Sequence, residues 1–197
     1  MIKAIIYDLG GVLIDDPWPG MATYYSEALH VDKDKFIEAY NKIVSIWQTG
    51  KITEKECWTN ITTSLNTHMP TSETLWLDGF KQTINEKKEI FLQIESFKKR
   101  GYKIGLLSNT EAPIMQFVLE QKYQDFDVYV FSCDIGVAKP NPKIYIEILR
   151  RLQIKPLEAV FIDDKEENIE SAKALGIHGI LFTTSPQVIT SIENLLA

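Results

Sequence analysis

The 197-residue sequence contains only two cysteines, and this scarcity excludes two kinds of site. Cys57 and Cys133 lie far apart and form no CxxC pair, so neither a disulfide framework nor a zinc ribbon is expected. We expect both thiols to be buried, apolar side chains in a reducing compartment. The sequence therefore predicts a cytoplasmic protein.

The sequence also lacks long apolar runs and any excess of basic residues. No run reaches the length of about 18 apolar residues that a membrane span needs. The apolar segment 1–14 contains Asp8 and no small-residue cleavage site follows it, which predicts a buried strand and not a signal peptide. The net charge of −6 makes nucleic acids and anionic membrane surfaces poor partners. An anionic ligand would have to be attracted by a few local cations, by helix N-termini or by a metal.

What the sequence does contain is typical of a globular protein. Hydrophobic residues make up 45% and charged residues 24% of the chain. The length predicts one domain of ordinary size, or one domain with a modest insertion. A chain of this length buries roughly 70% of its unfolded surface, which supports a core without disulfides or a structural metal.

Short apolar runs recur along the chain and predict strands that are covered on both faces. Helical patterns separate the later runs, with boundary signals at Gly101, Pro142 and Gly176. This alternation predicts βαβ units and hence an α/β fold with a doubly wound parallel sheet. The predicted strands are 4–7, 104–107, 128–131, 159–162 and 179–182.

Between about Pro17 and Asn85 the sequence shows only helical periodicity. Asp32 is a predicted N-cap for one apolar-faced helix that ends at Gly50. Thr53 and Glu56 have the spacing of a capping box and predict the start of the next helix.

These patterns divide the chain into two parts. We predict an α/β core made of residues 1–16 and 86–197, with a small all-helical cap inserted as residues 17–85. The tryptophans of the sequence all fall in the predicted cap, namely Trp18, Trp47, Trp58 and Trp76.

Polar residues follow several of the predicted strands at the point where each strand ends. Ligands of doubly wound sheets bind beyond the carboxyl ends of the strands, so these side chains are expected to meet. Taken singly, each has an ordinary explanation as a turn former, a helix cap or a solvated lysine. Their joint occurrence at the right ends of the strands favours a site. The residues are Asp8, Ser108, Asn109, Asp163 and Asp164, with Lys139 in the loop that follows the third strand.

The residue types at these positions indicate a particular chemistry. Three carboxylates at one edge of a sheet repel one another unless a cation is bound between them. Carboxylates and a backbone carbonyl are the oxygen ligands that Mg²⁺ prefers. A hydroxyl, an amide and an ammonium group beside such a metal suit the oxygens of a phosphoryl group.

Four segments carry these residues, and together they resemble the motifs of the haloacid dehalogenase (HAD) superfamily of hydrolases. The resemblance covers essentially the whole chain, and the order and spacing of the segments agree with it. It implies the strand order 5-4-1-2-3 and a helical cap over the site. The segments are residues 8–13 (DLGGVL), 107–110 (LSNT), 137–140 (VAKP) and 161–164 (FIDD), the last followed by Asn168, Ala172 and Gly176.

By this resemblance Asp8 is the nucleophile, which attacks phosphorus and forms an aspartyl-phosphate that water hydrolyses. Mg²⁺ is implied as the cofactor, held by Asp8, the backbone carbonyl of Gly10 and Asp164, with Asp163 as a further or water-mediated ligand.

The resemblance also assigns the phosphate-binding groups. Ser108 and the amide of Asn109 are expected to bind phosphoryl oxygens. Lys139 is expected to neutralise both Asp8 and the phosphoryl group, in a loop that Pro140 and Pro142 stiffen.

One position departs from the pattern of the family's phosphatases. Most of them have a second Asp two residues after the nucleophile, which protonates the leaving group and later activates water. Here that position is Gly10, so the general acid/base is missing. Asp15 and Asp16 are near in sequence, although Asp-Asp-Pro is also ordinary turn chemistry.

Several functions are compatible with these residues. We favour a phosphomonoesterase for a small phosphorylated substrate, with a sugar 1-phosphate as the first choice because its leaving group is good. The alternatives are a catalytically weak binding or regulatory protein and a dehalogenase, although attack on a haloalkyl carbon does not need the acidic pair. A phosphorylation-receiver domain would have its acidic pair after the first strand.

The substrate and the oligomeric state are not specified by the sequence, and a monomer or a homodimer is expected. Trp18, Tyr24, Tyr25 and Trp47 are candidates for the entrance of the site. Trp47 lies on an apolar helix face and is better explained as part of the cap core.

Overall fold

The computed structural model describes residues 1–121 and 126–196 of the chain. Its centre is a five-stranded sheet of order β3-β2-β1-β4-β5 in which every pair of neighbours is parallel. Read from the other edge, this is the predicted order, so the prediction of a doubly wound α/β fold is confirmed. The strands are β1 (Ala4–Tyr7), β2 (Lys103–Ser108), β3 (Val128–Phe131), β4 (Ala159–Asp163) and β5 (His178–Leu181).

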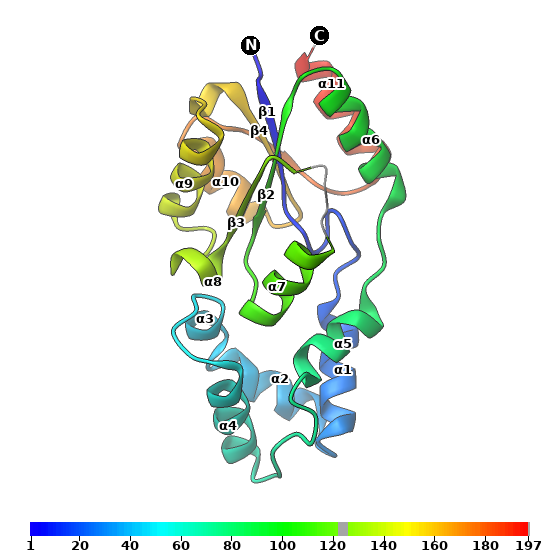
Figure 1. The fold of residues 1–197 in the computed structure, drawn as a ribbon, viewed down its shortest axis with the longest axis vertical. Helices are drawn as coiled ribbons and strands as arrows, with labels where there is room; N and C mark the ends of the chain where they lie inside the picture. Colours follow the sequence, from blue (N-terminus) through cyan, green and yellow to red (C-terminus); the bar gives the residue numbers. More distant parts are fainter. Residues whose placement is uncertain (122–125, 197) are drawn as a thin grey trace.

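Helices cover both faces of the sheet because successive strand side chains point to opposite sides. Ile5 and Tyr7 belong to the core that α6, α7 and α11 complete, whereas Ala4 and Ile6 pack with α9 and α10 (Figure 1). The result is a three-layer arrangement. These helices are α6 (Lys88–Lys99), α7 (Ala112–Glu120), α9 (Pro142–Leu152), α10 (Glu166–Ala174) and α11 (Ser185–Leu196).

Between β1 and α6 the chain forms helices and two isolated β-bridges but no strand, and Figure 1 shows the helices grouped below the sheet, away from both chain termini. We call this group the helical layer. Its aromatic side chains form much of its interior, with Trp76 in contact with Tyr25, Trp47 and Trp58. The exact division of the chain at residues 17 and 85 stays a prediction. The helices of the layer are α1 (Trp18–Ala28), α2 (Lys33–Asn41), α3 (Val44–Trp47), α4 (Glu54–Leu65) and α5 (Leu75–Thr83).

The single helix predicted from Asp32 to Gly50 is wrong, because the structure breaks it into α2 and α3. Asp32 is the N-cap as expected and accepts a hydrogen bond from the amide of Lys35. Ile43 leaves the helical conformation with φ −124° and ψ −12°. The break falls at two adjacent β-branched residues, Ile43 and Val44, whose side chains crowd the preceding turn of a helix.

Other local predictions have mixed outcomes. The capping box of Thr53 and Glu56 opens α4 as predicted. Cys57 is buried, but Cys133 is only half-buried, so the expectation of two buried thiols is wrong for the second. Two short elements flank the later strands, α8 (Ser132–Ile135) and a 3₁₀ turn at Pro156–Glu158.

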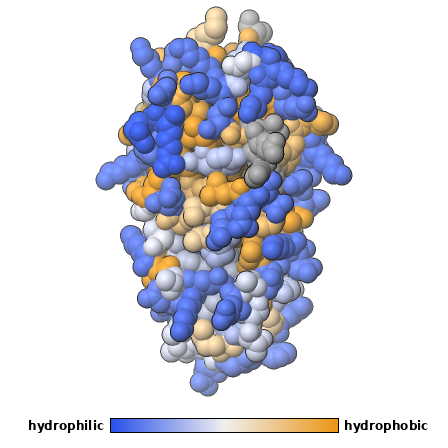
Figure 2. All heavy atoms as spheres, viewed as in Figure 1, coloured by the Kyte–Doolittle hydropathy of each residue, from blue (hydrophilic) through white to orange (hydrophobic). Residues whose placement is uncertain are grey.

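The surface of the molecule is mixed in character. On the face shown in Figure 2, hydrophilic residues cover much of both halves of the molecule. Hydrophobic residues are interspersed among them, mainly in the half that holds the sheet. Within residues 1–121 and 126–196, no helix is both long and apolar enough to cross a membrane.

Candidate active site

A cavity of about 450 Å³ lies between the carboxyl edge of the sheet and the helical layer. The loops that follow the strands supply one side of it, as the fold requires. The helical layer supplies the other side, including Trp18, Tyr40 and Trp76. The predicted site residues that line it are Asp8, Gly10, Ser108, Asn109, Lys139 and Asp164.

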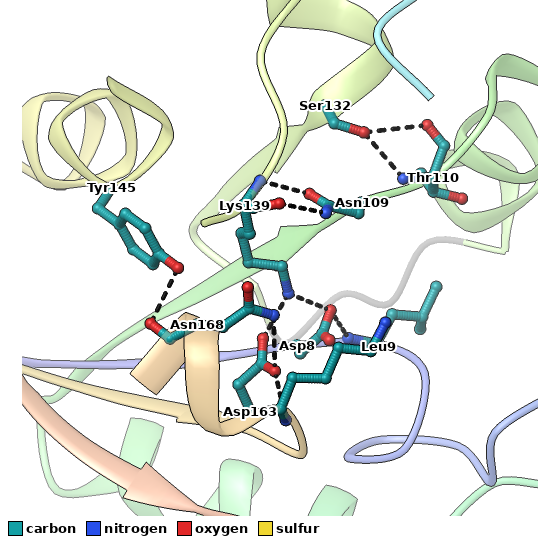
Figure 3. A network of polar contacts seen from close by, with 10 residues as sticks. Asp8, Leu9, Asn109, Thr110, Ser132, Lys139, Tyr145, Asp163 and Asn168 are labelled. Carbon is teal, nitrogen blue, oxygen red and sulfur yellow. Dashed lines mark hydrogen bonds and ion pairs between the residues drawn. The ribbon is translucent and has the colours of Figure 1, made fainter. Parts of the chain in front are cut away.

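Lys139 joins two of the predicted carboxylates. Its Nζ lies 2.8 Å from Oδ1 of Asp8 and 2.6 Å from Oδ2 of Asp163 (Figure 3). The lysine side chain is 1% exposed and that of Asp163 is 0% exposed, so water screens neither charge. Burial by itself lowers the pKa of Lys139, but the charges of Asp8 and Asp163 outweigh it and the pKa is raised. The lysine is therefore held as a cation.

The other oxygen of Asp163 is also engaged. Its Oδ1 accepts hydrogen bonds from the backbone amide of Lys165 and from Nδ2 of Asn168, each at 2.9 Å. The backbone carbonyl of Asn168 in turn accepts from the hydroxyl of Tyr145 (Figure 3). Asp163 does not line the cavity in the described structure. Its geometry suits a residue that fixes the position of Lys139.

A second set of contacts fixes the backbone of the lysine loop. The side chain of Asn109 donates to the carbonyl of Lys139 at 2.9 Å and accepts from its amide at 2.8 Å. Next to it, the amide of Thr110 donates to the buried hydroxyl of Ser132. The loops after β2 and β3 are thereby locked together. The side chain of Asn109 is committed to this contact, which leaves its backbone as the part that can serve a phosphate.

Asp8, Asp163 and Asp164 form a cluster in which one oxygen of each lies within 4.8 Å of the others. Burial raises the pKa of Asp8 to about 7, Lys139 opposes the rise and Asp163 adds to it. Burial, and then the charge of Asp163, also raise the pKa of Asp164. Burial and mutual repulsion thus both disfavour the charged forms of these carboxyls, and a cation bound between them would favour the charged forms.

Asp164 has the features of a cation ligand. Its Oδ1 is buried and has no hydrogen-bond partner in the described structure. The chain makes room for the side chain at Gly11, where φ is +79° and a Cβ atom would lie 2.5 Å from Oδ2 of Asp164. A hard divalent cation takes such oxygen ligands, so these residues fit the predicted magnesium site.

The structure separates the two carboxylates that were considered as replacements for the missing acid. Asp15 pairs with Lys87 and accepts a hydrogen bond from Nδ2 of Asn85, and these contacts lower its pKa. Asp15 does not belong to the described wall of the cavity. Asp16 does line the cavity, and its Oδ1 accepts from the amide of Trp18 at 3.1 Å.

Of the four aromatic residues considered for the entrance, Trp18 alone is in the cavity wall. Trp47 and Tyr25 are 1% and 0% exposed and form part of the core of the helical layer. Tyr24 is partly buried and packs against that core.

Glu111 is a cavity residue that the sequence did not single out. Its side chain is buried and accepts hydrogen bonds from Tyr40, Gln48 and Trp76 of the helical layer. Burial raises the pKa of its carboxyl, and the three donors oppose the rise. The sequence offers a single hint of its role. An acidic residue directly follows the predicted phosphate-binding segment 107–110, at the start of a helix.

Comparison with known proteins identifies the family of the chain. A family model described as haloacid dehalogenase-like hydrolase matches residues 2–176. The chain is 29% identical over 205 residues to acyl-CoA dehydrogenase family member 10 of Mus musculus, covering 98% of this chain and 19% of that protein. It is 26% identical over 188 residues to D-ribitol-5-phosphate phosphatase of Bacteroides thetaiotaomicron, covering 89% of each. A phosphorylated carbohydrates phosphatase of Thermotoga maritima is 26% identical and matches 91% of this chain and 84% of its own.

Among solved structures, a HAD family enzyme of Bacteroides thetaiotaomicron in complex with magnesium and inorganic phosphate superposes with a TM-score of 0.78 at 25% identity. The match covers 94% of this chain and 96% of that one. A predicted HAD-like family hydrolase of Porphyromonas gingivalis gives a TM-score of 0.82 at 24% identity and covers 100% of this chain and 98% of its own. The chain thus spans the full fold of some relatives and about a fifth of the mouse protein.

Proposed function

Because this chain belongs to the haloacid dehalogenase-like hydrolases, we propose that it is a Mg²⁺-dependent phosphomonoesterase that acts on a small phosphorylated metabolite. The observation that carries the proposal is the meeting of Asp8, Lys139 and Asp164 at one end of the cavity. A nucleophile, a fixed cation and a carboxylate pair are the parts that phosphoryl transfer needs.

In the proposed reaction, a carboxylate oxygen of Asp8 forms a bond to phosphorus as the bond to the leaving-group oxygen breaks. Water then attacks the phosphorus of the aspartyl-phosphate, which releases inorganic phosphate and restores Asp8. Lys139 offsets the charge of Asp8 and of the phosphoryl group, and Asp163 and Asn109 hold the lysine in place.

The remaining roles follow from position. Ser108 and the backbone amide of Asn109 bind phosphoryl oxygens at the end of β2. The carboxylates of Asp8 and Asp164 and the backbone carbonyl of Gly10 would hold Mg²⁺, with Asp163 as a water-mediated ligand. When bound, the metal would supply positive charge against the repulsion between the anionic nucleophile and the anionic substrate.

We further propose that the helical layer acts as the cap over the site and selects the substrate. Support comes from its share of the cavity wall. Two relatives are named for phosphorylated carbohydrate or polyol substrates, which favours a substrate of that kind. A second function, a binding protein of low turnover, is favoured by Gly10, which stands where the family's phosphatases have an acid.

The test compares wild type with Asp8→Asn on p-nitrophenyl phosphate, with Mg²⁺ and with EDTA. Asp34→Asn, an exposed Asp of α2, is the matched control. We expect turnover that requires Mg²⁺, is lost in Asp8→Asn and is kept in Asp34→Asn. Equal turnover by wild type and Asp8→Asn would rule out the phosphatase and leave the binding protein.

A further inference from the structure

The proposed chemistry uses the sheet end of the cavity, but a buried carboxylate in another part of its wall has no role in it. Glu111 is 3% exposed and precedes the first residue of α7. Its carboxyl group makes no hydrogen bond that caps α7. In the described structure, the residues that donate to its side chain all belong to the segment from α2 to α5, on the other side of the cavity from the ends of the strands.

The partners of Glu111 leave acceptor capacity free. Oε1 accepts from the hydroxyl of Tyr40 at 2.9 Å and from Nε2 of Gln48 at 3.1 Å. Oε2 accepts one hydrogen bond, the longest of the three, from Nε1 of Trp76 at 3.3 Å. The carboxyl also interacts with the backbone of Glu111 itself. A carboxylate oxygen accepts two hydrogen bonds, so as far as the other described residues are concerned Oε2 has room for one more donor. A hydroxyl group of a ligand in the cavity is such a donor.

The charge of the cavity wall restricts what the ligand can be. In the part of the wall that the structure describes, the only cations are Lys139 and Lys165. Lys139 is paired with Asp8 and Asp163, and Lys165 is an exposed residue beside Asp164. Acidic residues of the wall outnumber the cations, and they are Asp8, Asp16, Glu111, Asp164 and Glu167.

One phosphoryl group is accommodated at Lys139 and the metal ligands, but a second anion would face carboxylates. Tyr40 is stacked on both Trp18, at 4.3 Å between ring centroids, and Trp76, at 5.4 Å. Tyr40 and Trp76 are buried, so the half-buried Trp18 is the ring that offers an apolar face to the cavity. Rings of this kind pack against the C–H groups of a polyol or a sugar, which are apolar, while its hydroxyls seek acceptors.

We propose that Glu111 is a specificity-determining residue that accepts a hydrogen bond from a hydroxyl group in the non-phosphate part of the substrate. The site therefore selects phosphates of uncharged, hydroxyl-bearing molecules over phosphates that carry a second anion. This inference rests on the proposed phosphatase function and names its substrate class.

The test measures kcat/KM for three phosphates that share a five-carbon chain: a pentitol 5-phosphate, pentyl phosphate and a pentonate 5-phosphate. We expect wild type to prefer the pentitol ester over the pentyl ester by about 10- to 100-fold, as for a hydrogen bond to a charged group. The pentonate ester, which has a terminal carboxylate, is expected to be the poorest of the three.

Glu111→Gln keeps the shape of the side chain and removes its charge. We expect it to lose most of the preference for the pentitol ester, mainly through a higher KM, while kcat/KM for the pentyl ester changes less than about threefold. Glu120→Gln, at the exposed end of the same helix, is the matched control and is expected to keep the wild-type preference.

A wild-type preference below threefold overturns the proposal without any variant. An equal loss on all three esters in Glu111→Gln also overturns it, because the esters share an alkoxide leaving group and only a structural or proton-donating role would lower them alike. If wild type shows no Mg²⁺-dependent hydrolysis of p-nitrophenyl phosphate, the phosphatase function itself fails.

Discussion

Lys139 and Asp163 form the closest ion pair of the site, with 2.6 Å between Nζ and Oδ2, although the lysine lies in the loop before α9 and the acid ends β4. Asp163 has further partners on its other oxygen, whereas its neighbour Asp164 has a buried oxygen with none. The two consecutive acids therefore differ in what they can do. Asp163 positions the lysine, and Asp164 is available for a cation.

Replacing Lys139 by Ala is expected to destabilise the metal-free protein. The change leaves Asp8 and Asp163 buried without their cation, and an uncompensated buried charge costs on the order of 1–3 kcal/mol. Urea unfolding in EDTA measures this loss in the free energy of unfolding. Lys143→Ala, an exposed lysine at the start of α9, is the matched control, and a neutral Lys139→Ala would contradict the geometry of the site.

Replacing Asp164 by Asn is expected to abolish the Mg²⁺-dependent turnover. The change is not expected to lower the stability of the metal-free protein. Burial raises the pKa of Asp164, so the folded state disfavours its charged form. Wild type therefore loses stability relative to the variant as the pH rises through the folded pKa, and the two converge at pH values below the ordinary pKa of Asp.

Thermal melting in EDTA at a series of pH values tests the predicted sign of the difference in stability between wild type and Asp164→Asn. Asp34→Asn is the reference variant. Added Mg²⁺ is expected to raise the Tm of wild type and to leave Asp164→Asn unchanged. A variant that melts well below wild type at neutral pH would show instead that Asp164 is a structural cap.

Much of the sheet could be predicted because its strands are uninterrupted apolar runs that end at polar residues. All five predicted strands overlap the observed ones, and residues that follow three of them, Asp8, Ser108 and Asp164, line one cavity. Periodicity failed at Ile43, since apolar spacing continues through the break between α2 and α3 and only backbone geometry reveals it.

Glu111 could not be predicted as a buried residue for a different reason. Its partner Tyr40 lies 71 residues away, and the contact exists only because the helical layer meets the start of α7. A lone Glu before a helix looks like a solvated end of that helix in the sequence. Long-range packing between the two parts of the chain decides its burial.

The contact between the helical layer and the sheet part can be tested at Gly50. Its φ is +66°, and a Cβ atom there would lie 2.3 Å from the carbonyl oxygen of Cys133. Gly136 has a similar φ of +73° but no atom within 4 Å of such a Cβ. We expect Gly136→Ala to lose about 1 kcal/mol of stability and Gly50→Ala about 2–4 kcal/mol, because strain and a clash add. Equal losses would show that the two parts are not in contact in solution.

The absence of an acid at Gly10 predicts how wild type responds to the leaving group. A positioned general acid contributes about 10²–10⁴-fold, and an alkoxide needs its proton more than a phenolate or an anomeric oxygen does. We expect kcat/KM to fall steeply from acyl, aryl and sugar 1-phosphates to alkyl phosphates. If kcat/KM does not change across the series, another residue supplies the proton. Asp16 is then the first candidate, because it lines the cavity.

Gly10→Asp is expected to flatten that dependence by restoring a carboxyl group two residues after the nucleophile. The position accepts a side chain, since a Cβ atom there meets only Cδ of Pro17, at an ordinary 3.5 Å, and φ lies outside the left-handed range. The gain is expected to be largest for alkyl phosphates, up to about 10²-fold, and small for aryl phosphates. Gly10→Asn, which has the same shape but cannot transfer the proton, is the control. If Asp and Asn change the alkyl and aryl rates alike, the side chain acts through packing, and the missing acid does not limit the rate.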